Sequence, residues 1–459
     1  MASPVGARLA RGTFWSLMAG CVSRFLALVA SIIVARILGK ETFGQLGILQ
    51  STLDMFGSVA AFSMGLTATK YVAECRQSDP DKAGRIIAMS SVVSWLTGTI
   101  GTIALIFASP WLAGHALAAP QLAPLLQISS ISLLFGVVSG AQVGGLAGFE
   151  AFKQLAQINL VTGVLAVILR VGGTIVMGLK GAVYGMVFAQ VAGCIINFLV
   201  LRRLAAKDGI SVRYAHCLRD LPVIWKFSLP AVLSSLVLLP TTWLCNAMLV
   251  NRPGGYGEMA VFNAANQWFF VIMFIPALMG EAAMPILFDR MNHHDYRSAR
   301  KIFFTSIKLN ALVILPLVLL GFFGRQVMGL YGKGFSGGWE TLVIVLATAG
   351  LQVVQMPAGY ILSSAGRMWL LLLMNLGWAV SFAGVTALLV AHGSPGLASA
   401  RLIALCLHCT WTFAFAFHAL KTNREAEHES QQTDAAGQLK MLTTLEEQRA
   451  MIKTEGMLD

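Results

Sequence analysis

Charged and amide side chains stand in the middle of apolar segments of this 459-residue chain. Arg24 lies well inside the run AGCVSRFLALVASIIVARILG, and Asp54 lies in the next apolar segment, four residues after Gln50. A charge at the bilayer centre costs about 2.5–3.5 kcal/mol on insertion scales, so such residues line cavities or form pairs. We therefore expect Arg24 either to bind an anionic substrate in a wet cavity or to form an internal ion pair that fixes helix packing.

Helical spacing surrounds Arg24 with small and polar residues, because Ser16, Gly20, Ala27 and Ser31 fall on its face of a helix. About a dozen residues separate Arg24 from each end of its segment, which places it roughly 15 Å from either membrane surface. Snorkelling alone does not explain a cation at that depth. This predicts a helix with one narrow wet face.

Three other ionisable residues each allow two interpretations. Asp54 either pairs with Arg24 or binds a proton or sodium ion. Arg170 is either a second cationic contact for an anion or a residue that snorkels to an interface. Glu281, near the end of its apolar segment, is either a solvated or gate residue or a site at the midplane.

Two amides, Asn263 and Gln267, share a helix face at the predicted depth of Gln50 and Asp54. Amides bind hydroxyl-rich ligands by hydrogen bonds, and they also join neighbouring transmembrane helices. A ligand-binding role and a packing role are therefore both open for this pair.

The elements that carry these residues are transmembrane helices. The chain is 56% hydrophobic and only 12% charged, with a mean hydropathy of +0.72, whereas soluble domains carry about 25% charged residues. Apolar runs of roughly 20 residues, the length that spans a bilayer, recur throughout. We expect an all-α polytopic membrane protein with about twelve spans, at approximately 13–36, 43–67, 86–108, 122–146, 155–177, 181–201, 227–250, 259–286, 303–323, 341–363, 368–391 and 396–418.

The net charge of +12 reports topology and not nucleic-acid binding. With the N-terminus inside, eighteen Lys and Arg residues fall in inner segments and seven, Arg401 among them, in outer ones. Because cytoplasmic loops are enriched in these residues, we expect both termini to be cytoplasmic.

The two halves of the chain repeat each other. FGQLGILQSTLDMF at Phe43 matches YGEMAVFNAANQWF at Tyr256, 213 residues later, and Asn159 pairs with Asn375 at a spacing of 216. Six spans per half in the same orientation predict a parallel repeat of two lobes around a central cavity. The predicted organisation is an N-terminal lobe, a cytoplasmic linker, a C-terminal lobe and a cytoplasmic tail, at residues 1–201, 202–226, 227–418 and 419–459.

The sequence carries no enzyme signature. It has no Walker A motif and no HExxH, its outer loops are too short for a folded catalytic domain, and the pair Cys406–Cys409 is a weak metal signal. We expect no catalytic residue, no cofactor and no metal.

Motifs at three places in the chain carry a resemblance to a known family. The first helix ends in Arg36, Leu38 and Gly39, and the second begins at Phe43 and Gly44. LAGFEAFKQLAQINL (146–160) follows the fourth span, and AMPILFDR (283–290) ends the eighth. These motifs resemble the corresponding segments of bacterial polysaccharide flippases of the Wzx type. The resemblance covers about 1–418 and extends to the wider superfamily of multidrug, oligosaccharidyl-lipid and polysaccharide exporters.

The resemblance implies a MATE-like fold of two six-helix lobes, alternating access, and a substrate of sugars linked through pyrophosphate to a polyprenyl lipid. It implies a place in the bacterial inner membrane and a lumenal arginine at the position of Arg24. From the residues themselves we add Arg170 as a second cation that would help to hold the pyrophosphate. A coupling ion, H⁺ or Na⁺, and the polysaccharide polymerase machinery are further expected partners. The alternative is a cation-coupled multidrug antiporter of the same superfamily, for which midplane carboxylates would be expected instead of Arg24.

Overall fold

The computed structural model describes residues 4–212, 214, 217, 229–292, 295–312, 314–364 and 368–418. Within them, the side chains of 4–19, 229–236 and several single positions, including Glu281, are not described. Most of the linker after residue 212 and the whole predicted tail lie outside the described residues.

The described chain consists of helices joined by short turns. The N-terminal half contains α1 (Pro4–Ala60), α2 (Met64–Cys75), α3 (Pro80–Trp111), α4 (Ala123–Gly148) and α5 (Phe152–Lys207). The C-terminal half contains α6 (Leu229–Val250), α7 (Gly255–Asn292), α8 (Tyr296–Ala311), α9 (Ile314–Phe322), α10 (Gly324–Gly329), α11 (Trp339–Ser364), α12 (Met368–Leu389) and a final helix over 393–418.

Three apolar stretches are too long for one crossing of a membrane. Eight stretches are long and apolar enough to cross, and those of 41, 56 and 50 residues turn back on themselves at Gly39, Gly178 and Gly393. Each of these glycines has φ between 59° and 75°, in the left-handed region that residues with a Cβ rarely adopt. Counting these three as two crossings each, and adding the shorter apolar helix Val237–Val250, confirms twelve crossings among the described residues.

The backbone repeats at nearly the same period as the sequence. The left-handed turns at Gly39 and Gly254 are 215 residues apart, and so are those at Gly178 and Gly393. Gly332 marks a further turn at this end of the molecule, which we call the glycine-turn end. The opposite end, where the chain turns near 76–79, 149–151 and 208–212, we call the linker end.

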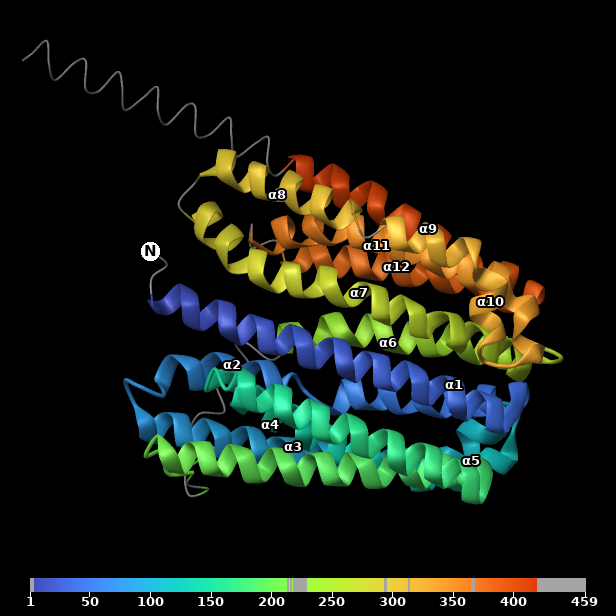
Figure 1. Ribbon diagram of the computed structural model, residues 1–459, viewed down its shortest axis with the longest axis horizontal. Coiled ribbons are helices and arrows are strands. Elements are labelled where there is room, and N and C mark those ends of the chain that lie inside the picture. Colours follow the sequence, from blue (N-terminus) through green and yellow to red (C-terminus); the bar gives the residue numbers. More distant parts are fainter. Residues whose placement is uncertain are drawn as a thin grey trace, which may run out of the picture.

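The helices form two lobes, α1–α5 and α6 to the final helix, which Figure 1 shows one above the other. They diverge toward the end that carries α2 and the start of α8. A shared hydrophobic core at the glycine-turn end joins Leu46 and Leu49 of α1 to Phe262 of α7. At the linker end, each lobe has a separate core, around Ile86 in one and Phe303 in the other. Among the described residues, the lobes therefore share a hydrophobic core at the glycine-turn end and have separate cores at the linker end.

Candidate functional site

A cavity of about 270 Å³ lies between the lobes, and we call it the central cavity. It brings together four of the predicted polar residues, Gln50, Asp54, Asn263 and Gln267, from the second limb of α1 and from α7. The side chain of Asp54 is exposed to this space. Helical periodicity and the internal repeat thus placed these four residues on facing walls of one cavity.

Glycine permits the close approach of the two lobes beside this cavity. A Cβ on Gly47 of α1 would lie 1.4 Å from Nδ2 of Asn263, and a Cβ on Gly44 would meet the backbone oxygen of Tyr256 at 1.8 Å. Real Cβ contacts are not shorter than about 3.0 Å, so an added Cβ would require a shift at both positions. At Gly44 the helices α1 and α7 touch backbone to backbone, whereas Gly47 leaves room for the Asn263 side chain.

Arg170 projects from α5 into the central cavity. Its guanidinium donates a hydrogen bond to Oε1 of Gln50 over 3.3 Å, while its Nε is buried with no partner in the described structure. The backbone of Gly185, on the second limb of α5, passes close to the Arg170 Cα. The side chain is thus aimed at the polar interior, and it also lines a second cavity described below.

Arg401 is a cavity residue that the sequence analysis placed wrongly among the outer segments. It lies eight residues into the final helix, its guanidinium donates to Oδ1 of Asn266 over 2.8 Å, and it stacks 4.2 Å from the ring centre of Phe269. The turn at Gly393 starts the helix early enough to carry Arg401 into the lobe interior. The signal available in the sequence was a single arginine within the apolar run ASARLIALCL.

A larger cavity of about 510 Å³, the N-lobe cavity, lies among α1, α4 and the two limbs of α5. Gly20 and Arg24 line it from the first limb of α1, and Arg170 lines it from α5. Ser31, seven residues after Arg24 on the same face of the helix, lines the central cavity. The predicted wet face of α1 therefore opens onto both cavities over its described part, while the side chain of Ser16 lies outside the described residues.

Arg24 also contacts the opposite lobe. The centre of its guanidinium lies 3.7 Å from the ring centre of Phe274 in α7, and it donates to the backbone oxygen of Gly20 over 3.5 Å. A Cβ on Gly20 would lie 2.2 Å from the Phe274 ring. Glycine at this position therefore leaves room for the aromatic ring beside the arginine.

No ion pair joins Arg24 to Asp54 in the described structure. The ion pairs between two described residues include Lys40–Glu258, Arg76–Glu150 and Arg290–Asp295. The predicted role of Glu281 cannot be placed, since its side chain lies outside the described residues.

A third hollow of about 430 Å³, the connecting cavity, shares lining residues with the other two. Gln190 belongs to both the N-lobe and connecting cavities, and Gln50 and Asp54 belong to both the connecting and central cavities. The described lining of the series carries three arginines and one carboxylate. Positive charge is therefore in excess. No three metal-ligating side chains converge anywhere in the part of the chain that was searched.

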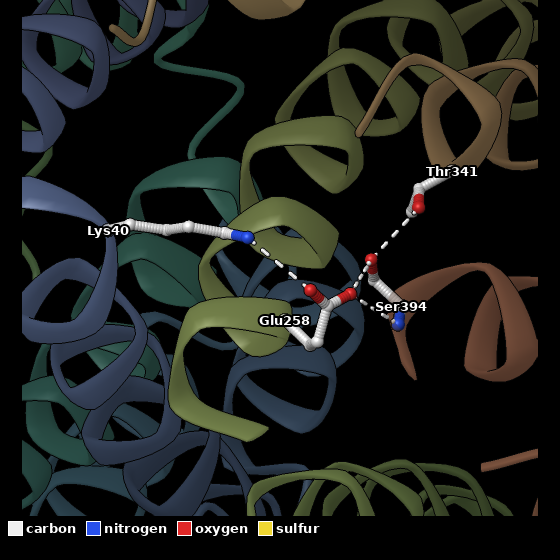
Figure 2. A network of polar contacts seen from close by, with 4 residues as sticks. All are labelled: Lys40, Glu258, Thr341 and Ser394. Carbon is white, nitrogen blue, oxygen red and sulfur yellow. Dashed lines mark hydrogen bonds and ion pairs between the residues drawn. The ribbon is translucent and has the colours of Figure 1, made fainter. Parts of the chain in front are cut away.

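A polar network closes the glycine-turn end (Figure 2). Lys40, directly after the Gly39 turn, lies 3.3 Å from Oε1 of Glu258 in α7. Oε2 of Glu258 accepts hydrogen bonds from the backbone N–H of Ser394 at 2.9 Å and from its hydroxyl at 2.6 Å, and the Ser394 oxygen accepts from Thr341 at 3.0 Å. The carboxylate therefore sits at the N-terminus of the final helix, where the helix dipole favours negative charge.

Further hydrogen bonds join the lobes at this end. Arg36 donates from Nε to the backbone oxygen of Leu330 over 2.6 Å. The hydroxyl of Tyr256 donates to the backbone oxygen of Leu117 over 2.7 Å, and Asn251 donates to that of Ala116 over 2.6 Å. Side chains of one lobe thus cap backbone oxygens of the other.

Comparison with known proteins identifies relatives of this arrangement. The family model described as "Polysaccharide biosynthesis protein" matches residues 9–291. The EPS I polysaccharide export inner membrane protein EpsE of Ralstonia nicotianae is 28% identical over 197 residues, which cover 41% of this chain and 44% of the relative. Stage V sporulation protein B of Bacillus subtilis is 27% identical over 201 residues, which cover 42% of this chain and 38% of that protein. The chain thus matches less than half the length of these curated relatives.

Solved structures share the fold along nearly their whole length. A multidrug resistance MATE family transporter of the MOP superfamily in an inward-facing conformation has a TM-score of 0.76 at 18% identity, covering 88% of this chain and 96% of that chain. An outward-facing conformation of such a transporter has a TM-score of 0.68 at 17% identity, covering 91% of this chain and 96% of that chain. The predicted MATE-like fold of two lobes is confirmed.

Proposed function

Because the chain belongs to the polysaccharide biosynthesis protein family, we propose that it is a flippase that moves a glycan, linked through pyrophosphate to a polyprenyl lipid, across the bacterial inner membrane for surface polysaccharide assembly. The observation that carries this proposal is the set of three guanidiniums, from both lobes, on one connected series of cavities. The protein is a multi-pass membrane protein with the fold of a transporter.

Arginine suits the pyrophosphate part of this substrate. The guanidinium keeps its charge and binds phosphate oxygens through two parallel hydrogen bonds. Arg24 and Arg170 face the N-lobe cavity, while Arg170 and Arg401 face the central cavity. A pyrophosphate could thus exchange the first pair of cations for the second without leaving a positively charged environment.

The amides of the central cavity suit the glycan. Gln50, Asn263 and Gln267 offer both donors and acceptors, as sugar hydroxyls do. The buried Nδ2 of Asn263 has no partner among the described residues, so a hydrogen bond to a substrate hydroxyl would satisfy it. The polyprenyl chain stays in the bilayer, where its apolar surface costs nothing to solvate.

Transport follows from the one-sided packing of the lobes. The shared core and the Lys40–Glu258 network hold the glycine-turn end closed, while the cores at the linker end are separate. The excess of Lys and Arg at the linker end favours a cytoplasmic position for it. Substrate would enter from the cytoplasmic leaflet, and rocking of the lobes would open the glycine-turn end to the periplasm.

A second candidate function is cation-coupled multidrug antiport, which the exposed carboxylate of Asp54 in the central cavity favours. Three arginines against one carboxylate would repel a cationic drug, so the lining favours the anionic glycolipid. Asp54 could still bind a coupling H⁺ or Na⁺ in either mechanism.

Translocation in proteoliposomes tests the proposal directly. Purified protein is reconstituted with a polyprenyl-pyrophosphate disaccharide, and a membrane-impermeant glycosidase reports how fast the glycan reaches the outside. We expect translocation by the wild-type protein and at least tenfold slower translocation by Arg170→Gln, because the pyrophosphate loses a charged partner. Ethidium transport in the same vesicles, with no movement of the glycolipid, would favour the antiporter instead.

A further inference from the structure

The N-lobe cavity contains more hydrogen-bonding capacity than the protein itself uses. Its two facing walls are the two limbs of α5. The first limb contributes Asn159 and Arg170, and the second contributes Gln190 and Asn197. Eleven residues separate Asn159 from Arg170, or about 16 Å along the helix. The cavity is thus long enough to hold more than the phosphate groups that would bind beside Arg170.

Of the three amides that line this cavity, one joins two helices and two are unpaired. Asn197 donates to the hydroxyl of Ser139 over 2.7 Å and so joins α5 to α4. The side-chain amides of Asn159 and Gln190 make no hydrogen bond to any described residue, and both contribute to the cavity lining. A third group, the buried Oδ1 of Asn197, also lacks a partner within the described structure.

The two unpaired amides are open to the cavity, since Asn159 is exposed and Gln190 half-buried. At this depth they form hydrogen bonds to water or to a ligand. The residues that line the cavity restrict the chemical class of this ligand. Its described lining includes no Asp or Glu, so a cation finds no counter-charge, while Arg24 and Arg170 favour a neighbouring anion. Amides donate and accept at once, which matches the hydroxyl groups of a sugar ring. A volume of about 510 Å³ falls in the usual range of ligand sites.

We propose that the N-lobe cavity is a sugar subsite, in which Asn159 and Gln190 hydrogen-bond the sugar attached directly to the pyrophosphate while Arg170 holds the phosphate. This inference rests on the proposed function and makes it more specific. The first sugar is recognised within the N-terminal lobe, and the remainder of the glycan extends into the connecting and central cavities. Specificity for the first sugar and affinity for the charged group then belong to different residues of the same cavity.

Binding of two lipid probes separates these roles. One probe is polyprenyl pyrophosphate without sugar, and the other carries a single glucose or a single N-acetylglucosamine. The full-length protein in lipid nanodiscs should bind one of the glycosylated probes about tenfold more tightly than the bare lipid, the gain expected from two hydrogen bonds. The double variant Asn159→Leu/Gln190→Leu should lose that preference and keep its affinity for the bare lipid, which also shows that it is folded.

Two controls complete the test. Asn375→Leu changes the repeat-related asparagine, which lines none of the three cavities, and should keep the tenfold preference. Arg170→Gln should weaken the binding of the bare and the glycosylated probes equally. Equal binding of bare and glycosylated lipids by the wild-type protein would overturn the sugar subsite and leave the flippase proposal standing. The same conclusion would follow if the double variant Asn159→Leu/Gln190→Leu kept the preference. Failure of the wild-type protein to bind any of the lipids would overturn the flippase proposal itself.

Discussion

The ammonium nitrogen of Lys40 lies 3.3 Å from the carboxylate of Glu258, and this ion pair joins the two lobes across the glycine-turn end (Figure 2). Its two partners are held differently. Glu258 accepts two hydrogen bonds from Ser394 of its own lobe, whereas Lys40 reaches across on a long side chain that is 35% exposed. When the lobes separate, the carboxylate can stay bound in its lobe while the lysine leaves.

Removing the lysine charge should favour opening of the glycine-turn end. Ion pairs with this exposure contribute about 0–1 kcal/mol, so Lys40→Gln should raise the population of the open state by up to about fivefold. Electron spin resonance distances between labels at Lys180 and Lys333, one on each lobe at this end, would measure the populations. Lys153→Gln at the linker end is the control, since Lys153 is exposed and makes none of the described ion pairs. An unchanged distance distribution in Lys40→Gln would show that the pair does not contribute to closure.

The serine beneath the ion pair should matter more for stability than the pair itself. Ser394 and Thr341 are buried, at 1% and 0% exposure. Ser394→Ala removes a donor to Glu258 and leaves the Thr341 hydroxyl without its acceptor, a loss of about 1–3 kcal/mol. Thermal unfolding in detergent should show a lower midpoint temperature. Ser336→Ala is the matched control, because Ser336 donates only to the nearby backbone oxygen of Lys333 in an exposed turn, and a drop of equal size there would contradict the argument.

A single methyl group at Gly44 should force the lobes apart at the same end. The added Cβ would meet the Tyr256 backbone oxygen at 1.8 Å, and backbone cannot rotate away as a side chain can. We expect Gly44→Ala to shift the Lys180–Lys333 distance distribution toward the open state or to lower the stability of the closed one. Gly57→Ala, on the same limb of α1 with nothing within 4 Å of its Cβ, should do neither. A Gly44→Ala protein that stays closed and equally stable would disprove the contact.

Local features of the sequence were sufficient for the fold and for part of the candidate site. Apolar run length predicted the twelve crossings, and helical spacing with the internal repeat put Gln50 and Asp54 opposite Asn263 and Gln267. Both signals act within one helix or between repeated segments. Neither signal depends on how the two lobes are oriented relative to each other.

Features that depend on lobe orientation could not be predicted from the sequence. Lys40 and Glu258 are 218 residues apart, and only the closed glycine-turn end brings them together. Arg401 was misplaced for a simpler reason. It lies only five residues into the predicted span 396–418, and it was counted with the outer segments. The turn at Gly393 puts it about 12 Å inside the observed helix, and its contacts with Asn266 and Phe269 of the facing helix are not visible in the sequence.

Arg401 should be required for export, and its geometry should matter as well as its charge. Arg401→Gln removes the charge, and we expect about a tenfold loss of surface polysaccharide in a deletion strain complemented with the variant at equal protein level. Arg401→Lys should restore export only in part, because an ammonium keeps the charge but loses the planar fork that binds phosphate and stacks on Phe269. Arg325→Gln is the matched control, since Arg325 also stacks on an aromatic ring, that of Trp339, but lines none of the cavities. Full export by Arg401→Gln would remove the C-terminal lobe from the anion site and leave Arg24 and Arg170 to hold the pyrophosphate alone.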